Sequence, residues 1–308
     1  MAGHHKDGSA QPGDESPGVK TFGHLAQKLF NVPLFLKPEK AELLVAALAA
    51  RFGLLSSLRV DDHTPSSSAD VQGSGGSMES MVEPGYELSH GLAVIDIRGT
   101  LVQRTAGLRP DSGMTGYDAI RRSLYEALDD PDVHGICLSI DSPGGEAAGC
   151  LELVNALYAV RGEKPCWAIL SPSAGGGAYA IASTADRIIM PETGDVGSLG
   201  PILIHIDWVE ALNRGAVNVS MMQYRSPAQR PLHPAPLHAE DLLQFQERLD
   251  AAGDLLIQAI SRHRSLSSKI LCEISRRSLT AAEARATGLV DDVMPPDAAF
   301  RALLGALP

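Results

Sequence analysis

The sequence predicts an α/β protein in which a largely parallel sheet is flanked by helices. From about residue 88 onward, short apolar runs alternate with segments whose apolar residues recur at helical spacing. Such alternation is typical of strand–helix–strand units, whose parallel strands are joined by right-handed crossovers. The 308 residues, 44% of them hydrophobic, provide enough apolar side chains for one main domain with a sizeable core.

The chain before this domain divides by composition into three segments. Residues 1–22 are rich in Gly, Ser, Pro and charged residues, and we expect a disordered leader there. Residues 23–57 are predicted to form a small N-terminal helical arm, because apolar residues recur in it at helical spacing: Leu43, Leu44, Ala47 and Leu48. Residues 58–87 have the Ser- and Gly-rich composition of a flexible linker, which leaves 88–308 as the main domain.

Within the main domain, the elements are predicted in chain order. Thr115 should cap the helix that begins near Tyr117, and the helix after the Gly-rich turn should end at Asp186. A further helix is expected through Leu151, Val154 and Leu157, and a long amphipathic helix over 239–260. Strands are expected at 91–99, 135–140, 166–170, 187–190 and 217–222, with a short one at 289–293.

Two glycine motifs follow neighbouring strands of the predicted sheet. The first is Asp141-Ser142-Pro143-Gly144-Gly145, and the second is Ser173-Ala174-Gly175-Gly176-Gly177. Each comes after an apolar run, and each is expected to form a turn that leads into a helix. Glycine turns of this kind let backbone N–H groups approach a reacting carbonyl, so the pair predicts an oxyanion-type pocket.

These motifs, together with Ala178–Ile188 and Gly197-Ser198-Leu199-Gly200, resemble the signal peptide peptidase A family of serine–lysine peptidases, especially its phage head-maturation branch. The similarity covers roughly residues 22–308 and includes the arm around Asn31–Lys40. It implies a ClpP/crotonase-like spiral fold and a homo-oligomer that processes scaffold, portal or capsid segments. It also implies oxyanion or substrate-binding roles for Gly144, Gly145 and Gly177, and makes Ser198 the counterpart of the serine that assists the lysine.

Both reactive residues of that family are substituted here. Counting back from Tyr179 or from Asp186 places Gly176 at the position of the nucleophilic serine. The lysine position falls at Ala228 or Gln229, and the neighbouring arginines cannot act as a base because guanidinium stays protonated. Since losing such a nucleophile or base costs about a millionfold in kcat, we expect a catalytically impaired or inactive protein.

Under three alternative hypotheses the protein would still be an active enzyme. Ser173, three residues before Gly176, or Ser171, five residues before it, could be a relocated nucleophile. We consider Ser173 the candidate, although its ordinary role would be in a turn or a helix cap. A Ser–His–Asp arrangement would draw on titratable groups in the second half of the chain: His205, Asp207, His233 and His238. A crotonase-like acyl-CoA enzyme would use the Gly175–Gly177 turn as an oxyanion hole without a serine, but no glutamate pair follows that turn.

Composition excludes several other classes of function. The net charge of −11 argues against a nucleic-acid-binding face, and no apolar run approaches the roughly 20 residues that span a bilayer. The polar N-terminus does not resemble a signal peptide, so we expect a cytoplasmic protein. The resemblance to the phage branch implies that this cytoplasm is that of a bacterial host and that the protein is associated with the prohead. The four cysteines lack CxxC spacing, and we expect neither a metal nor an organic cofactor.

Overall fold

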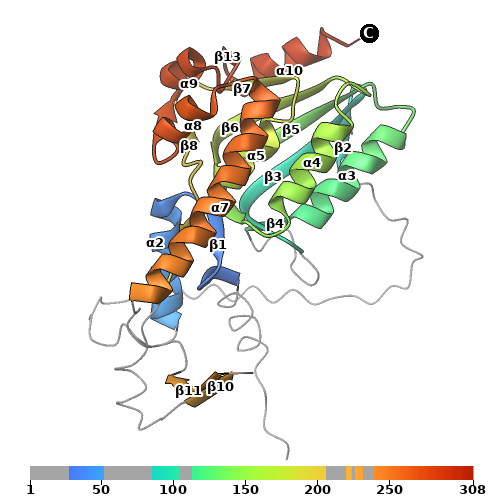
Figure 1. Cartoon of the computed structure of the whole chain (residues 1–308). Helices are drawn as coiled ribbons and strands as arrows, with labels where there is room; N and C mark the ends of the chain where they lie inside the picture. The colour runs from blue at the N-terminus through green and yellow to red at the C-terminus, as the bar shows by residue number, and fades with distance from the viewer. Residues whose placement is uncertain are drawn as a thin grey trace, which may run out of the picture.

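A computed structural model describes residues 28–51, 85–104, 113–205, 220–223, 226–231 and 239–307. Four strands lie parallel at the centre of its main sheet: β3 (Leu92–Val102), β5 (Gly135–Glu146), β6 (Cys166–Gly175) and β7 (Arg187–Met190). Leu138 of β5, for example, lies between Ile95 of β3 and Ala168 of β6. The predicted α/β architecture with a largely parallel sheet is therefore confirmed (Figure 1).

Shorter strands extend this sheet at its margins, so that it contains eleven of the described strands. They are β1 (Pro33–Leu36), β2 (Glu87–Ser89), β4 (Met114–Gly116), β8 (Asp195–Gly197), β9 (Ile202–Leu203), β12 (Ser278–Thr280) and β13 (Asp292–Val293). Two more, β10 (Ser220–Gln223) and β11 (Ser226–Pro231), pair only with each other.

Helices cover both faces of the sheet (Figure 1). The main core lies under α3 (Tyr117–Asp129), α4 (Cys150–Ala159), α5 (Gly176–Ala182) and α7 (Ala239–Arg264). A second apolar cluster on the other face joins α10 (Pro296–Leu304) to Trp167 and Ile189. The remaining helices are α2 (Pro38–Arg51), α8 (Ser268–Ile274) and α9 (Ala281–Thr287). Of the helices described, none combines the length and apolar character that crossing a bilayer requires.

Three local predictions were wrong. The N-cap of α3 is Gly116, because the Thr115 hydroxyl donates to the Arg98 carbonyl at 2.6 Å and is committed to the neighbouring strand. The first glycine motif forms no turn, since it continues β5 as far as Glu146. Helix α5 ends at Ala182 instead of Asp186, whose carboxylate accepts the Cys166 N–H at 2.9 Å.

The largest departure from the predictions is that the arm contributes a strand as well as a helix. Strand β1 lies between β5 and β9 and is antiparallel to both. Its side chains alternate as strand geometry requires: Phe35 enters the main core, whereas Leu34 and Leu36 enter a smaller cluster beneath α2. The arm is thus part of the sheet (Figure 1, blue).

The C-terminal part of α7 is held against the residue that follows α5. His263 is 4% exposed, its Nδ1 lies 2.9 Å from the Ser183 hydroxyl, and its ring stacks on Tyr158 with centroids 4.2 Å apart. Burial, assisted by the charges of Arg262 and Arg161, lowers the pKa of His263 from 6.5 to about 4. The structure therefore favours the neutral imidazole.

Phe35→Ala should lower the free energy of unfolding by about 3–5 kcal/mol, because it removes a ring that is 1% exposed from the main core. Leu43→Ala, on the same arm but 61% exposed, should change it by less than about 0.5 kcal/mol. Urea denaturation of both variants and the parent provides the comparison. Equal effects would show that β1 does not pack as described.

Acid should weaken the fold through His263. Because the pKa of His263 is lower in the folded state than in the unfolded chain, the unfolded chain binds the proton more tightly. Stability should be complete above about pH 6.5 and should fall toward pH 4, by up to about 3 kcal/mol from this group. His263→Gln should flatten that slope in thermal or urea melts, whereas His134→Gln, at an exposed position, should leave it unchanged.

Candidate active site

The first glycine motif meets the arm through main-chain hydrogen bonds. Phe35 of β1 lies opposite Gly145 of β5. On either side of this pair, the Lys37 N–H donates to the Pro143 carbonyl at 3.0 Å, and the Ala147 N–H donates to the Pro33 carbonyl at 3.3 Å. Hydrogen-bonded pairs alternate along an antiparallel ladder, so Phe35 and Gly145 form the hydrogen-bonded pair between them. The Gly145 N–H therefore points at the Phe35 carbonyl.

The second glycine motif approaches the same carbonyl from α5. Gly176, the first residue of α5, has φ +47°, and a Cβ there would lie 2.3 Å from the Phe35 oxygen and 2.6 Å from its carbonyl carbon. Gly144, with φ +96°, would place a Cβ 1.9 Å from that oxygen. All three distances are far shorter than a van der Waals contact, so a side chain at either position would overlap the Phe35 carbonyl. The two motifs identified in the sequence thus converge on Phe35, and their glycines leave the space that its carbonyl fills.

The thiol of Cys150, which lies beside Gly177, offers no replacement nucleophile. A Cβ at Gly177 would lie 3.1 Å from the Cys150 sulfur and 3.3 Å from the Tyr117 hydroxyl. Burial raises the pKa of Cys150 to about 12, so this thiol stays protonated near neutral pH. Burial also raises the pKa of Tyr117, whose hydroxyl donates to the Glu146 carbonyl at 2.7 Å.

A lysine that the sequence analysis did not single out lies beside the second motif. The stem of Lys37 crosses Gly175, whose Cβ would lie 2.6 Å from the lysine Cγ. Its Nζ donates to the Ser173 hydroxyl at 2.6 Å and forms an ion pair with Asp195. A single charge at the end of the apolar run Leu34–Leu36 was the signal available in the sequence. It was overlooked because a pairing over more than a hundred residues leaves no local pattern.

The Lys37–Ser173 contact does not form a nucleophile–base pair in this geometry. The Lys37 Nζ is paired with the Asp195 carboxylate as well as with the Ser173 hydroxyl, so it is not dedicated to the serine. Ser173 lies on β6 three residues before Gly176, which corresponds to about 10 Å along an extended strand. A cavity of about 580 Å³, also lined by Arg98 and Asp141, opens beside the pair.

The hydroxyl of Ser198 lies beside that of another serine. Ser198 follows β8, whose Gly197 lies opposite Gly175 of β6, so the structure brings the third motif to the end of the second. The Ser198 hydroxyl lies 3.4 Å from that of Ser278, and its N–H donates to the Arg277 carbonyl at 2.9 Å. Its role as a helper serine stays a prediction.

Most of the remaining predicted site residues lie wholly or partly outside the described part of the structure. Ala228 and Gln229 lie in β11, but their side chains are outside the described part of the structure. His205 contacts the arm, with its Nδ1 2.9 Å from the Asn31 amide oxygen. The other members of the alternative Ser–His–Asp arrangement lie outside the described residues: Asp207, His233 and His238.

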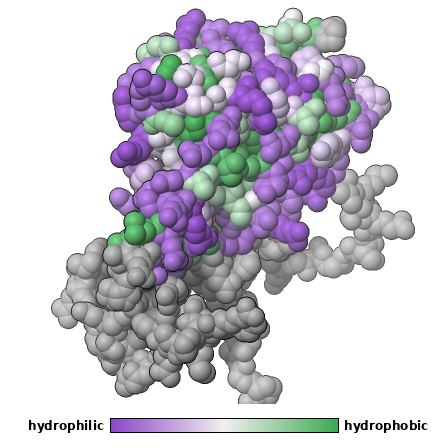
Figure 2. Space-filling view, in the orientation of Figure 1, coloured by the Kyte–Doolittle hydropathy of each residue, from purple (hydrophilic) through white to green (hydrophobic). Residues whose placement is uncertain are grey.

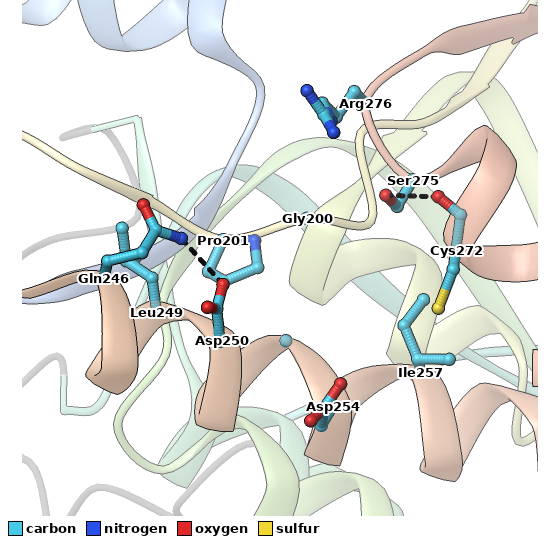
Figure 3. A pocket seen from close by; sticks show the side chains of 11 residues that line it. Gly200, Pro201, Gln246, Leu249, Asp250, Asp254, Ile257, Cys272, Ser275 and Arg276 are labelled. Carbon is cyan, nitrogen blue, oxygen red and sulfur yellow. Dashed lines mark hydrogen bonds between the residues drawn. The ribbon is translucent and has the colours of Figure 1, made fainter. Parts of the chain in front are cut away.

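A second cavity, of about 600 Å³, lies between α7, α8 and Pro201 (Figure 3). Gln246 donates to Asp250 at its rim. None of the catalytic or oxyanion residues predicted from the sequence lines it. Across the part of the chain that is described, no three His, Cys, Asp or Glu side chains gather in an arrangement that could hold a metal ion.

Comparison with known proteins identifies relatives of this chain. The model of peptidase family S49 matches residues 159–304. Capsid assembly protease C of Escherichia phage lambda is 30% identical over 294 residues, which cover 94% of this chain and 67% of that protein. Head-tail preconnector protein GP5 of Enterobacteria phage P21 is 29% identical over 294 residues, which cover 94% of this chain and 58% of that protein. The chain therefore spans about three fifths to two thirds of the length of these two phage relatives.

More distant matches lie outside the phages. Protease 4 of Haemophilus influenzae is 25% identical over 211 residues, which cover 68% of this chain and 33% of that protein. Among solved structures, the ClpP protease catalytic domain from Plasmodium falciparum aligns with a TM-score of 0.38 and 14% identity, covering 66% of this chain and 85% of that one.

Gly176→Ser should destabilise the protein more than backbone strain alone explains, because its Cβ would overlap the Phe35 carbonyl. Gly162→Ser is the matched control: Gly162 also has positive φ, +93°, but nothing lies within 4 Å of its Cβ position. We expect about 1–2 kcal/mol for the control and a further 1–3 kcal/mol at position 176, measured by urea denaturation. Equal losses would mean that β1 does not lie against Gly176.

Proposed function

This chain belongs to peptidase family S49, and from this premise we propose that it acts in phage head assembly by holding an extended peptide segment without cleaving it. The observation that carries the proposal is Gly176. At the position where the family's serine is expected, the residue has no hydroxyl and leaves no room for a side chain beside the Phe35 carbonyl.

The chemistry of amide hydrolysis explains why this substitution matters. A serine–lysine peptidase needs a hydroxyl, a neutral lysine within hydrogen-bond reach, and N–H donors for the oxyanion. The main-chain N–H of Gly145 supports the third requirement, since it points at a carbonyl oxygen. The first requirement fails at Gly176 and, on the alignment of motifs, the second fails at Ala228 or Gln229. A site of this composition can bind a peptide carbonyl but cannot attack it.

The relatives suggest what such a site would hold. Two of them are named for capsid assembly and for the head–tail connection of phages, which favours scaffold, portal or capsid segments as partners. An extended segment can be bound by main-chain hydrogen bonds along a strand edge, with specificity supplied by alternate side chains. The proposal requires no cofactor, and it places the protein in the host cytoplasm with the prohead.

We also propose that the chain forms a homo-oligomer, with α7 as a contact surface. Leu242, Leu243 and Leu255 of this helix are each more than half exposed. The rest of the described surface on this side of the molecule is mostly hydrophilic, with apolar residues gathered near its centre (Figure 2). Exposed apolar side chains on this helix are candidates for burial between subunits.

One observation favours a second candidate function, an active protease with Ser173 as a relocated nucleophile: the 2.6 Å contact between Ser173 and Lys37. Against it stand the ion pair of Lys37 with Asp195 and the position of Ser173 on β6, three residues before Gly176. A displacement of even about 1 Å can cost a hundredfold in rate, and the displacement here is several times larger. The non-cleaving function is therefore better supported.

Incubation with fluorescein-labelled casein tests the two candidates directly. We expect no release of fluorescent peptides by the parent chain and the same result for Ser173→Ala. Thermal melts should show that both proteins are folded, and a diluted serine protease sets the detection limit. Cleavage by the parent that is lost in Ser173→Ala would establish the relocated nucleophile and overturn the proposal. Cleavage that survives Ser173→Ala would also overturn it and would point to another nucleophile.

A further inference from the structure

We propose that β1 is an internal ligand of the peptide site: residues 33–36 occupy the strand position that a bound peptide would take, with the Phe35 carbonyl at the reacting position. The inference deepens the proposed function and rests on it, because that function identifies Gly176 as the position of the family's nucleophile. It names the occupant as a segment of this same chain.

The geometry of the sheet defines a slot one strand wide. Strand β1 is antiparallel to β5 on one side and to β9 on the other, with Leu34 opposite both Glu146 and Ile202. Neighbouring strands lie about 4.8 Å apart, so without β1 the strands β5 and β9 would face each other across about 10 Å. Their inner edges would then present unpaired N–H and C=O groups, which a single extended segment can satisfy.

The arm lies in this slot as a substrate would. The carbonyl carbon of Phe35 lies 2.6 Å from the Cβ position of residue 176, so the Phe35 carbonyl fills the space in which the family's serine side chain would stand. The oxygen of the same carbonyl is the acceptor for Gly145. The bond between Phe35 and Leu36 therefore takes the place of a scissile bond, and Gly176 lets it rest there uncleaved.

The side chains of β1 indicate which peptides fit the slot. Phe35 is 1% exposed in the main core, and Leu34 and Leu36 are fully buried on the opposite side of the strand. Both faces of the segment are thus enclosed by apolar atoms. The class of ligand is an extended peptide with an aromatic residue between two leucines or similar aliphatic residues.

Polar contacts hold the arm at both ends of the slot. Beyond Leu36, Lys37 pairs with Asp195 and donates to Ser173. Before Pro33, the Asn31 N–H donates to the Ile204 carbonyl at 2.9 Å. The Lys28 ammonium lies 3.2 Å from a Glu146 oxygen, with both side chains mostly buried. These contacts fix the position of the arm in the slot, and an unrelated apolar strand would not make them.

Binding of a peptide in trans tests the inference on the full chain. The probe is a fluorescein-labelled peptide of residues 28–40, and binding is read by fluorescence anisotropy. In Phe35→Asp the arm must leave the slot, because a carboxylate cannot be buried there. We expect this variant to bind the peptide at least tenfold more tightly than the parent, whose slot is filled. Leu43→Asp is the matched control, since it adds the same charge to the arm at an exposed position and should behave as the parent.

Several outcomes would overturn the inference. One is a folded Phe35→Asp protein that binds the peptide no more tightly than the parent and Leu43→Asp do. Another is equal binding of a control peptide that carries aspartate at its own phenylalanine position. If Phe35→Asp shows no cooperative melting transition, the experiment uses Lys37→Ala instead, which removes the contacts of the arm with Asp195 and Ser173. Tighter binding of the peptide by this variant than by the parent supports the inference, and unchanged binding overturns it. Cleavage of casein by the parent would refute the proposed function but would not alter this binding result, so the two failures are distinguishable.

Discussion

The contact between the Phe35 carbonyl and two glycine backbones determines the arrangement of the rest of the site. Gly144 and Gly176 come from different motifs, and each would place a Cβ within 2.3 Å of the Phe35 oxygen. Any other residue at either position would push β1 out of the sheet or distort the strand beside it. The arm, the end of β5 and the start of α5 are therefore mutually dependent. Gly176, which the motifs predict to stand at the family's nucleophile position, is thus also the residue that accommodates the arm.

This constraint connects packing with function. Because β1 alternates between two apolar clusters, inserting its carbonyl beside Gly176 also buries Phe35 on one face and two leucines on the other. Lys37 then closes the far end through Asp195 and Ser173. The contact that first suggests a serine–lysine pair is explained as an attachment point of the arm. In our proposal, β1 takes the position that a bound peptide would occupy.

The sequence was sufficient to predict the central strands and most helices because their patterns are local. The helices that became α3, α4 and α7 show apolar residues at helical spacing, and the buried strands are continuous apolar runs. Strand β1 was missed because it is four residues long and its partners lie more than a hundred residues away. The motif at Gly144 was interpreted as a turn, since adjacent glycines usually mark one, although here they allow close approach within a strand. The motifs were sufficient to predict the family, and the position of its serine stays a prediction from them. That β1 lies against Gly176 could only come from the three-dimensional arrangement.

Hydrogen exchange at the Gly145 amide tests the central claim most directly. In β5 this N–H points toward β1, so its protection reports whether the arm occupies the slot. In the full chain we expect it to exchange as slowly as the amides of core residues such as Leu138, and to lose that protection in Phe35→Asp while Leu138 keeps its own. Rapid exchange of the Gly145 amide in the parent chain would contradict the account, because it would show that β1 is not paired with this N–H.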